Sequence, residues 1–345
     1  MRSKKAGPPD ISADPFHERA LPVSRTRMHL LGGAFEFECG SPELRRLVDW
    51  AYAGLPRHKL TEVPPRIRIS IAPAPPARRR AQAEPPRIEM ISGAGLLCGT
   101  TSSSDFAVLS SDHRSALVVV SRDMRRFPYH TRYELIEFAV FTLAARAQGL
   151  MPLHGACVGR DGRGLLLFGD SGAGKSTASL HCLLRGMDFL AEDSIFVAPD
   201  TMLATGIANF LHVRSDSLHS LPASSASAIR RSPVIRRRSG VEKFEVDLRR
   251  RPEYRLAASP LKVAGIVFIS ARSARRGVLL TPLRSRETVA RFKKSQPYAV
   301  NQPGWSTFRK RIAALPAFEV RRGRSPAEAA DALQSLLEDG DPPAR

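Results

Sequence analysis

Short apolar runs separated by polar turns dominate the first third of the chain. Three of these runs have the composition of strands, and they are Met28–Phe37, Arg66–Ile71 and Leu117–Val120. Two glycines interrupt the first of them. A helix is predicted over Ser41–Leu55, because Ser41 suits the cap, Pro42 suits the first turn and apolar residues recur at helical spacing. The pattern predicts a small α+β domain over residues 25–128.

Two segments of this first part lack apolar runs. Residues 1–24 are polar and rich in proline, and they predict a disordered N-terminal tail. Residues 72–87 (APAPPARRRAQAEPPR) are rich in proline and arginine, so they predict an extended, solvated loop within the small domain.

The pattern changes at Thr131 and predicts a second domain over residues 129–345. Thr131 and Glu134 have capping-box spacing, a largely apolar helix is predicted as far as Gln148, and Gly149 suits a left-handed helix end. Apolar runs that predict strands follow, and they are Leu153–Val158, Gly164–Phe168, Asp188–Leu190, Ile195–Val197 and Val263–Ser270. With a helix between them, this order predicts an α/β core.

Two further segments complete the second domain. Residues 220–240 are rich in serine and arginine and predict a mobile loop. Within it, Arg230–Arg238 is a candidate docking segment for an acidic peptide, and solvated surface charge is the alternative interpretation. A last helix is predicted to begin at Ser325, because Ser325 and Glu328 have capping-box spacing and Pro326 takes the first helical position.

The clearest chemical signal lies at Gly169–Thr177. The first eight residues fit the G-x-x-x-x-G-K-[ST] pattern of a phosphate-binding loop, and they are Gly169, Asp170, Ser171, Gly172, Ala173, Gly174, Lys175 and Ser176. A predicted strand precedes the loop and a predicted helix follows it. Glycines let backbone N–H groups turn toward phosphates, Lys175 is expected to reach the β- and γ-phosphates, and the Ser176 hydroxyl is expected to ligate Mg²⁺. We therefore expect ATP and Mg²⁺ as ligands.

The loop motif indicates a nucleoside triphosphate but not the reaction, which has to be inferred from the residues around the loop. Glu192 and Asp193 follow a predicted strand, where one acid can hold Mg²⁺ and the other can accept a proton from an attacking hydroxyl. The structural alternative for this pair is a solvated acidic turn. His154 lies on the strand that enters the loop hairpin, and it is a further candidate, although a lone histidine in an apolar strand is more often structural.

Taken together, Leu150–Val197 resembles the catalytic domain of HPr kinase/phosphorylase. The shared features are a His-Gly pair, a serine within the phosphate-binding loop, a basic residue with glycine at the helix end, and paired acids. They are found here as His154-Gly155, Ser171, Arg185-Gly186 and Glu192-Asp193. The resemblance covers a P-loop kinase domain and implies a serine kinase that uses ATP and Mg²⁺.

The resemblance also implies roles for individual residues. Glu192 stands where the family has the aspartate proposed as base, and Asp193 matches the second acid. Ser176 and Asp193 are thereby assigned to the metal, His154 matches the active-site histidine, and Lys175 joins the catalytic residues. Either Glu192 or Asp193 could be the base.

The later signature of the family, with its metal-binding glutamate and downstream arginine, has no recognisable copy here. Arg214, Lys243 and Arg284 are cations that could take its place. The resemblance therefore implies neither HPr as substrate nor the reverse phosphorylase reaction. The N-terminal half is more similar to HPr-kinase-related proteins, some of which phosphorylate a serine of a lasso-peptide precursor. By this analogy, the expected substrate is a peptide or protein serine, in an acidic or C-terminal context.

Charge and composition bear on the partners. The 345 residues carry a formal net charge of +20, which suits a polyanion or an acidic peptide. The arginines occur in scattered short runs and only 7% of residues are aromatic, so nucleic acid is not favoured. A nucleic-acid-associated NTPase, a small-molecule (serine) kinase and a nucleotide-sensing regulator stay open as alternatives.

Location is predicted from what the sequence lacks. There is no apolar signal core near the start and no run of about 18 apolar residues, so neither export nor membrane insertion is expected. The four cysteines lack C-x-x-C spacing and predict reduced thiols. We expect a cytoplasmic protein, and the oligomeric state is left open.

Overall fold

The structure is a computed structural model that describes residues 23–74, 84–85, 87–101 and 104–338. The first sheet has seven strands in the order β1-β2-β3-β7-β6-β5-β4. Their bounds are Ser24–Leu30, Gly33–Cys39, Arg66–Pro73, Glu89–Gly93, Leu96–Thr100, Phe106–Ser110 and Ser115–Val120, for β1 to β7 in chain order. The proposed tail and the proline- and arginine-rich loop lie mostly outside the described residues.

The first run of the sequence forms a hairpin rather than one interrupted strand. Leu31 and Gly32 both have positive φ, at 51° and 80°, and β1 pairs antiparallel with β2 across them. Two consecutive positive φ values are characteristic of the tight turns that reverse a chain between two strands. The predicted helix after this hairpin is confirmed as α1 (Pro42–Tyr52), whose cap Ser41 accepts a hydrogen bond from the Leu44 N–H.

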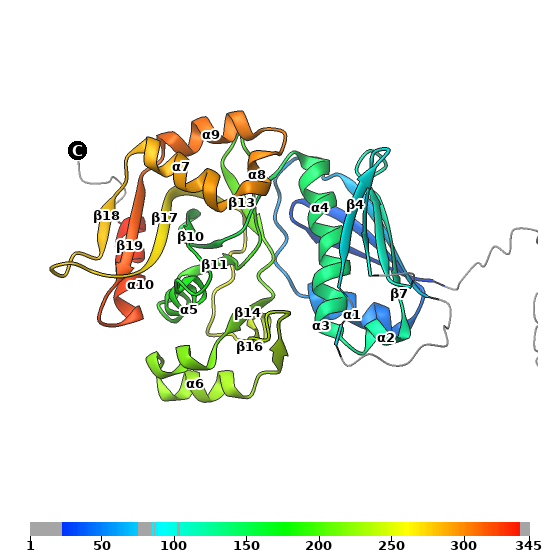
Figure 1. Cartoon of the computed structure of the whole chain (residues 1–345), viewed down its shortest axis with the longest axis horizontal. Coiled ribbons are helices and arrows are strands. Elements are labelled where there is room, and N and C mark those ends of the chain that lie inside the picture. Colours follow the sequence, from blue (N-terminus) through cyan, green and yellow to red (C-terminus); the bar gives the residue numbers. More distant parts are fainter. Residues whose placement is uncertain (1–22, 75–83, 86, 102–103, 339–345) are drawn as a thin grey trace, which may run out of the picture.

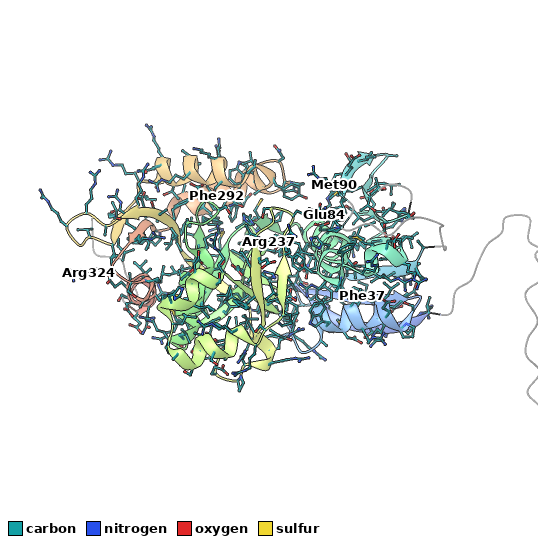
Figure 2. The ribbon with its side chains drawn as sticks, turned by 60° about the horizontal axis from the view of Figure 1, so that its bottom comes forward. Phe37, Glu84, Met90, Arg237, Phe292 and Arg324 are labelled. Atoms are coloured by element: carbon teal, nitrogen blue, oxygen red, sulfur yellow. The ribbon has the colours of Figure 1, made fainter. Side chains whose placement is uncertain are left out.

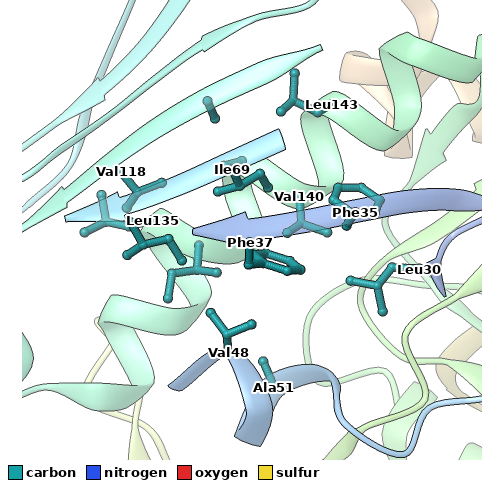
Figure 3. Packing of buried hydrophobic residues seen from close by; sticks show 14 of the residues in the cluster. Leu30, Phe35, Phe37, Val48, Ala51, Ile69, Val118, Leu135, Val140 and Leu143 are labelled. Carbon is teal, nitrogen blue, oxygen red and sulfur yellow. The ribbon is translucent and has the colours of Figure 1, made fainter. Parts of the chain in front are cut away.

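One face of the first sheet is covered by α1 and α4 (Glu137–Gln148). Alternate strand residues meet apolar residues of both helices, as Figure 3 shows for Phe37, Val48, Ile69, Val140 and Leu143. The sequence placed α4 at the start of the second domain, but its apolar side chains belong to the first core. Their burial there removes apolar surface from water.

The predicted capping box at Thr131 is wrong. The chain is already helical before it, through α2 (Arg122–Arg125), α3 (Pro128–His130) and the π-helix η2 (Thr131–Ile136), and continues into α4. The Thr131 hydroxyl donates to the Met124 carbonyl at 2.7 Å, and Glu134 pairs with Arg238. A tertiary partner and a preceding helical turn have replaced the local cap. Gly149 ends α4 in the left-handed conformation, as predicted.

The second sheet has nine strands, with the path β11-β9-β10-β17-β13-β12-β8 and with β18 and β19 beside β17. Their bounds are β8 Met151–Leu153, β9 Ala156–Arg160, β10 Arg163–Phe168, β11 Asp188–Ala191, β12 Ile195–Val197, β13 Leu203–Gly206, β17 Leu261–Ser273, β18 Leu280–Pro282 and β19 Ala317–Arg322. The run Leu153–Val158 is thus two strands with a bend between them. β10 and β19 each lie parallel to β17.

Helices cover both faces of this second sheet (Figure 1). The helices α5 (Lys175–Leu184) and α10 (Pro326–Glu338) contribute to one apolar core, and α7 (Ser285–Ser295) and α9 (Trp305–Ala314) contribute to another, with the short α8 (Pro297–Val300) beside them. The predicted start of α10 is confirmed, since Ser325 Oγ accepts from the Ala327 N–H at 3.1 Å. No helix in the described ranges is long and apolar enough to cross a membrane.

The predicted mobile loop at 220–240 is instead largely ordered. It follows the 3₁₀ segment η3 (Ser215–Ser220) and contains α6 (Ala223–Arg230) and β15 (Val234–Arg236). β15 belongs to a small sheet, β14-β16-β15, with β14 at Phe210–Val213 and β16 at Glu242–Asp247, and the 3₁₀ turn η4 (Leu248–Arg250) follows. Ala226 and Ile229 are buried, and their burial stabilises a segment whose serines and arginines suggested a loop.

Candidate active site

The proposed phosphate-binding loop connects the end of β10 to the start of α5. Gly169 opens it with φ of +154°, and a Cβ atom there would lie 2.4 Å from the Ile269 carbonyl oxygen on the neighbouring β17. Gly174 precedes α5 with φ of +107°, and no side chain caps this helix. The first N–H groups of α5 are therefore uncapped by side chains, as an anion-binding loop requires.

Lys175 is folded back over the loop. Its Nζ donates to the carbonyl oxygen of Gly169 at 2.7 Å and lies 3.3 Å from that of Asp170. These are weak partners that bound phosphate oxygens could replace, because charge-assisted hydrogen bonds to an anion are stronger. Thr177, at the end of the motif, forms a 3.0 Å hydroxyl contact with Ser217.

Glu192 contacts Ser176, the last residue of the G-x-x-x-x-G-K-[ST] motif. The Ser176 hydroxyl donates to one carboxylate oxygen of Glu192, and the backbone N–H of His212 donates to the other at 3.1 Å. Burial, together with the nearby Asp193, raises the pKa of Glu192. The sequence had paired Ser176 with Asp193 as metal ligands, whereas the structure places Ser176 against Glu192.

Asp193 faces a different partner. Its Oδ2 lies 2.7 Å from Nη2 of Arg237, and it adopts a positive φ of 66°, which is uncommon for a residue other than glycine. Burial acts to raise the pKa of Asp193, but the attraction of Arg237 outweighs it and holds the pKa below the usual range. The two adjacent acids thus differ, one next to the loop hydroxyl and one bound to an arginine.

His154 lies in the bend between β8 and β9, rather than on a strand as predicted. Its Nδ1 is 3.1 Å from the Asp193 carbonyl oxygen. Its backbone is held by one side chain, because its N–H donates to Gln296 Oε1 at 2.7 Å and its carbonyl accepts from Nε2 at 2.9 Å. The structure therefore brings His154 to the acids, and Gln296 is a positioning residue that local sequence patterns did not indicate.

The loop, His154 and Asp193 open onto one cavity of about 760 Å³, whereas Glu192 and Gln296 are not part of its lining. It is lined by Ser171, Gly172, Gly174, Lys175, Ser176 and Thr177 of the loop, by His154 and Asp193, and by cations from distant segments. Those cations are Arg214, Arg237, Lys243, Arg322 and Arg324. Arg214 and Lys243 were expected as candidates. Arg284, the third candidate, immediately precedes α7 and is not among the lining residues.

The donor set suits Mg²⁺ with a nucleotide. Ser176 and Glu192 offer hydroxyl and carboxylate oxygens, which are the ligands that this ion prefers, and it keeps its other positions for water and phosphate. No cluster of three or more histidine, cysteine, aspartate or glutamate side chains with metal-binding geometry occurs within the described ranges. Such a cluster is not needed for an ion that one or two protein oxygens hold on a phosphate.

A fully buried ionic cluster lies close to Glu192 and Asp193. Arg132 of η2 is 1% exposed, and its guanidinium lies between the rings of Trp50 and Phe210, 4.4 Å and 4.3 Å from their centroids. It forms ion pairs with Glu245 and, at 3.4 Å, with Glu137. A cavity of about 20 Å³ separates this cluster from Glu192 and Asp193.

Glu137 in this cluster is expected to make stability depend on pH. Burial raises its pKa from 4.5 to about 7, although Arg132 acts in the opposite direction. The folded state therefore keeps a proton that the unfolded chain has lost, and the contribution of Glu137 to stability falls as pH rises from 4.5 to about 7. Glu137→Gln should consequently gain up to about 3 kcal/mol over the wild type between pH 4.5 and 7.

Urea unfolding of both proteins at intervals from pH 5 to 8 measures this difference. Titrating groups that do not interact with Glu137 are common to both proteins and cancel in the comparison, whereas Arg132, His212 and Glu245 interact with it. A difference that stays constant over the whole range would contradict the raised pKa of Glu137.

Comparisons with known proteins add little to this picture. No protein-family model matches the chain, and no curated protein matches it either. Among solved structures, one similar protein is the HPr(Ser) kinase/phosphatase from Coxiella burnetii, with 12% identity and a TM-score of 0.27 over 55% of this chain and 94% of that chain. Similarity at this level carries no argument about function, so the functional conclusion has to rest on the site itself.

Proposed function

We propose that the protein is an ATP- and Mg²⁺-dependent kinase that transfers a phosphoryl group to a serine hydroxyl of a peptide or protein. The observation that carries this proposal is the shared cavity. It brings together the glycine-rich loop before α5, Ser176 and Asp193, and Glu192 contacts Ser176 from outside the cavity lining. A nucleotide site alone would need only the loop, whereas a phosphotransfer site also needs acids beside the terminal phosphate.

The two acids suit different tasks. Glu192 lies against Ser176, so these two residues would hold Mg²⁺, which when bound supplies positive charge to the phosphates. Asp193 lies at the cavity and would accept the proton of the serine hydroxyl while the oxygen forms its bond to phosphorus and the bond to ADP breaks. This division reverses the one that the sequence resemblance implied for the metal.

The acceptor would carry negative charge. Apart from Lys175, the cavity wall holds five cations from three segments, and among the described residues only Arg214 and Arg237 are paired with carboxylates inside it. Lys243 also has a lowered pKa, because it is partly buried and lies near Arg237. An acidic or C-terminal serine peptide would complement this wall, and the precursor of a lasso-peptide pathway is one candidate of that kind.

Mass spectrometry of acidic and C-terminal serine peptides after incubation with Mg·ATP tests the proposal. A gain of one phosphate on serine is expected. ATP hydrolysis that proceeds only with DNA or RNA, with a steep salt dependence, would favour a nucleic-acid-associated NTPase instead.

Glu192→Gln is expected to raise the Mg²⁺ concentration needed for half-maximal turnover and to lower the maximal rate by about 10²-fold. The amide keeps the shape and the contact with Ser176 but loses the negative charge that binds the ion. Turnover measured against Mg²⁺ concentration checks both effects. Glu62→Gln is the matched control, because Glu62 is 89% exposed and lies outside the cavity lining, and it should leave the Mg²⁺ dependence unchanged.

A further inference from the structure

The turn between β15 and β16 places Arg237 at the cavity. The turn is closed by its own backbone, since Arg237 N–H donates to the Val241 carbonyl at 2.9 Å and Gly240 N–H donates to the Arg237 carbonyl at 2.8 Å. The next residue, Arg238, is anchored to Glu134 of η2, with Nε 2.6 Å from Oε1. Arg237 therefore extends from a fixed turn, near the middle of the molecule (Figure 2).

Arg237 uses only part of its guanidinium group on Asp193. One nitrogen, Nη2, donates to Asp193 at 2.7 Å, while the Nε–H group is buried without a hydrogen-bond partner among the described residues. A buried donor without an acceptor is unfavourable, and the planar guanidinium is built to contact two oxygens of a phosphate at once. Arg237 thus has unused donor capacity beside a cavity that also contains Lys175 and Ser176.

The ion pair with Asp193 also engages an acid that the reaction would use. Oδ2 of Asp193 accepts from Arg237, and this charge-assisted hydrogen bond makes the carboxylate a weaker proton acceptor for a hydroxyl. Bound triphosphate would bring several negative charges to the same cavity and compete with the single charge of Asp193. The contact is therefore one that nucleotide binding can exchange.

We propose that Arg237 exchanges Asp193 for the γ-phosphate when Mg·ATP binds. This inference rests on the proposed function. On the γ-phosphate, the guanidinium would neutralise charge as the phosphoryl group moves from the ADP oxygen to the serine oxygen. The released Asp193 would then face the acceptor hydroxyl and take its proton. Arg237 would be a catalytic residue. Its hairpin would link nucleotide binding to the release of Asp193 from its ion pair, so that Asp193 can act as the base.

Binding of two nucleotides separates this role from a merely structural one. Isothermal titration calorimetry with Mg·AMP-PNP and with Mg·ADP would be done on the full chain, as wild type and as Arg237→Met. Loss of the γ-phosphate contact should weaken AMP-PNP about tenfold more than ADP. Arg236→Ala is the matched control, because Arg236 is exposed on the same hairpin, and it should affect neither nucleotide.

The possible results are distinct. Equal weakening of both nucleotides, or no change in either, would overturn the role of Arg237 at the γ-phosphate while leaving the nucleotide site intact. Failure of the wild type to bind both would overturn the proposed function and this inference with it. If Arg237→Met does not fold, Arg237→Lys gives the same comparison, because lysine keeps the charge but not the two-point contact.

Discussion

Replacing Lys175 with alanine is expected to lower the rate of γ-phosphate transfer from ATP by about 10³-fold. The ammonium group lies on the phosphate-binding loop, 2.7 Å from the Gly169 carbonyl oxygen, and shares a cavity with Ser176 and Asp193. Bound phosphates would draw it away from the carbonyl oxygens it now contacts. Without it, charge that develops on the β- and γ-phosphates during transfer would lose the cation that the loop itself provides.

Transfer of radiolabelled γ-phosphate, to serine peptides or to water when no acceptor is present, measures this effect. The substitution removes only hydrogen bonds to two loop carbonyls, so thermal unfolding should change little. Lys294→Ala is the matched control, because Lys294 is exposed on α7 outside the cavity lining. Wild-type transfer by a folded Lys175→Ala protein would refute the proposed mechanism.

Glu245→Ala is expected to lower the free energy of unfolding by about 3–5 kcal/mol. Arg132 and Glu245 each expose 1% of their side chains, and they lie between the first core and the small sheet. Removing the carboxylate leaves the Arg132 charge buried, with Glu137 at 3.4 Å as its remaining acidic partner. The cation cannot recover its hydration there, so most of its desolvation cost is uncompensated.

Urea unfolding measures this loss, and a double variant identifies its cause. Arg132→Met combined with Glu245→Leu removes both charges and should recover most of the lost stability. The surface pair Arg27–Glu36 is the matched control, since Arg27 is 85% exposed, and Glu36→Ala should change stability by no more than about 0.5 kcal/mol. A loss at Glu245 as small as the one at Glu36 would mean that Glu137 alone balances Arg132.

Local patterns predicted the elements next to the loop and several others, because local interactions form them. Ser41 and Pro42 start α1, Gly149 ends α4, and the glycines of the loop allow a backbone that no other residue could adopt at Gly169. Predictions failed where a distant partner determined the outcome. Thr131 was predicted to be a helix cap, but the chain is already helical before it, and Glu134 pairs with Arg238 rather than with the backbone of Thr131.

The sequence by itself determined that a glycine-rich loop with Lys175 and Ser176 would lie between a strand and a helix, with two acids after the next strand. Only the tertiary structure decided which acid lies at Ser176, because Glu192 and Asp193 are adjacent and their side chains point to different partners. It also decided that Arg237 reaches Asp193 and that Arg132 reaches Glu245, contacts that span 44 and 113 residues. Pairings over such separations depend on how sheets and helices pack, and no local spacing records them.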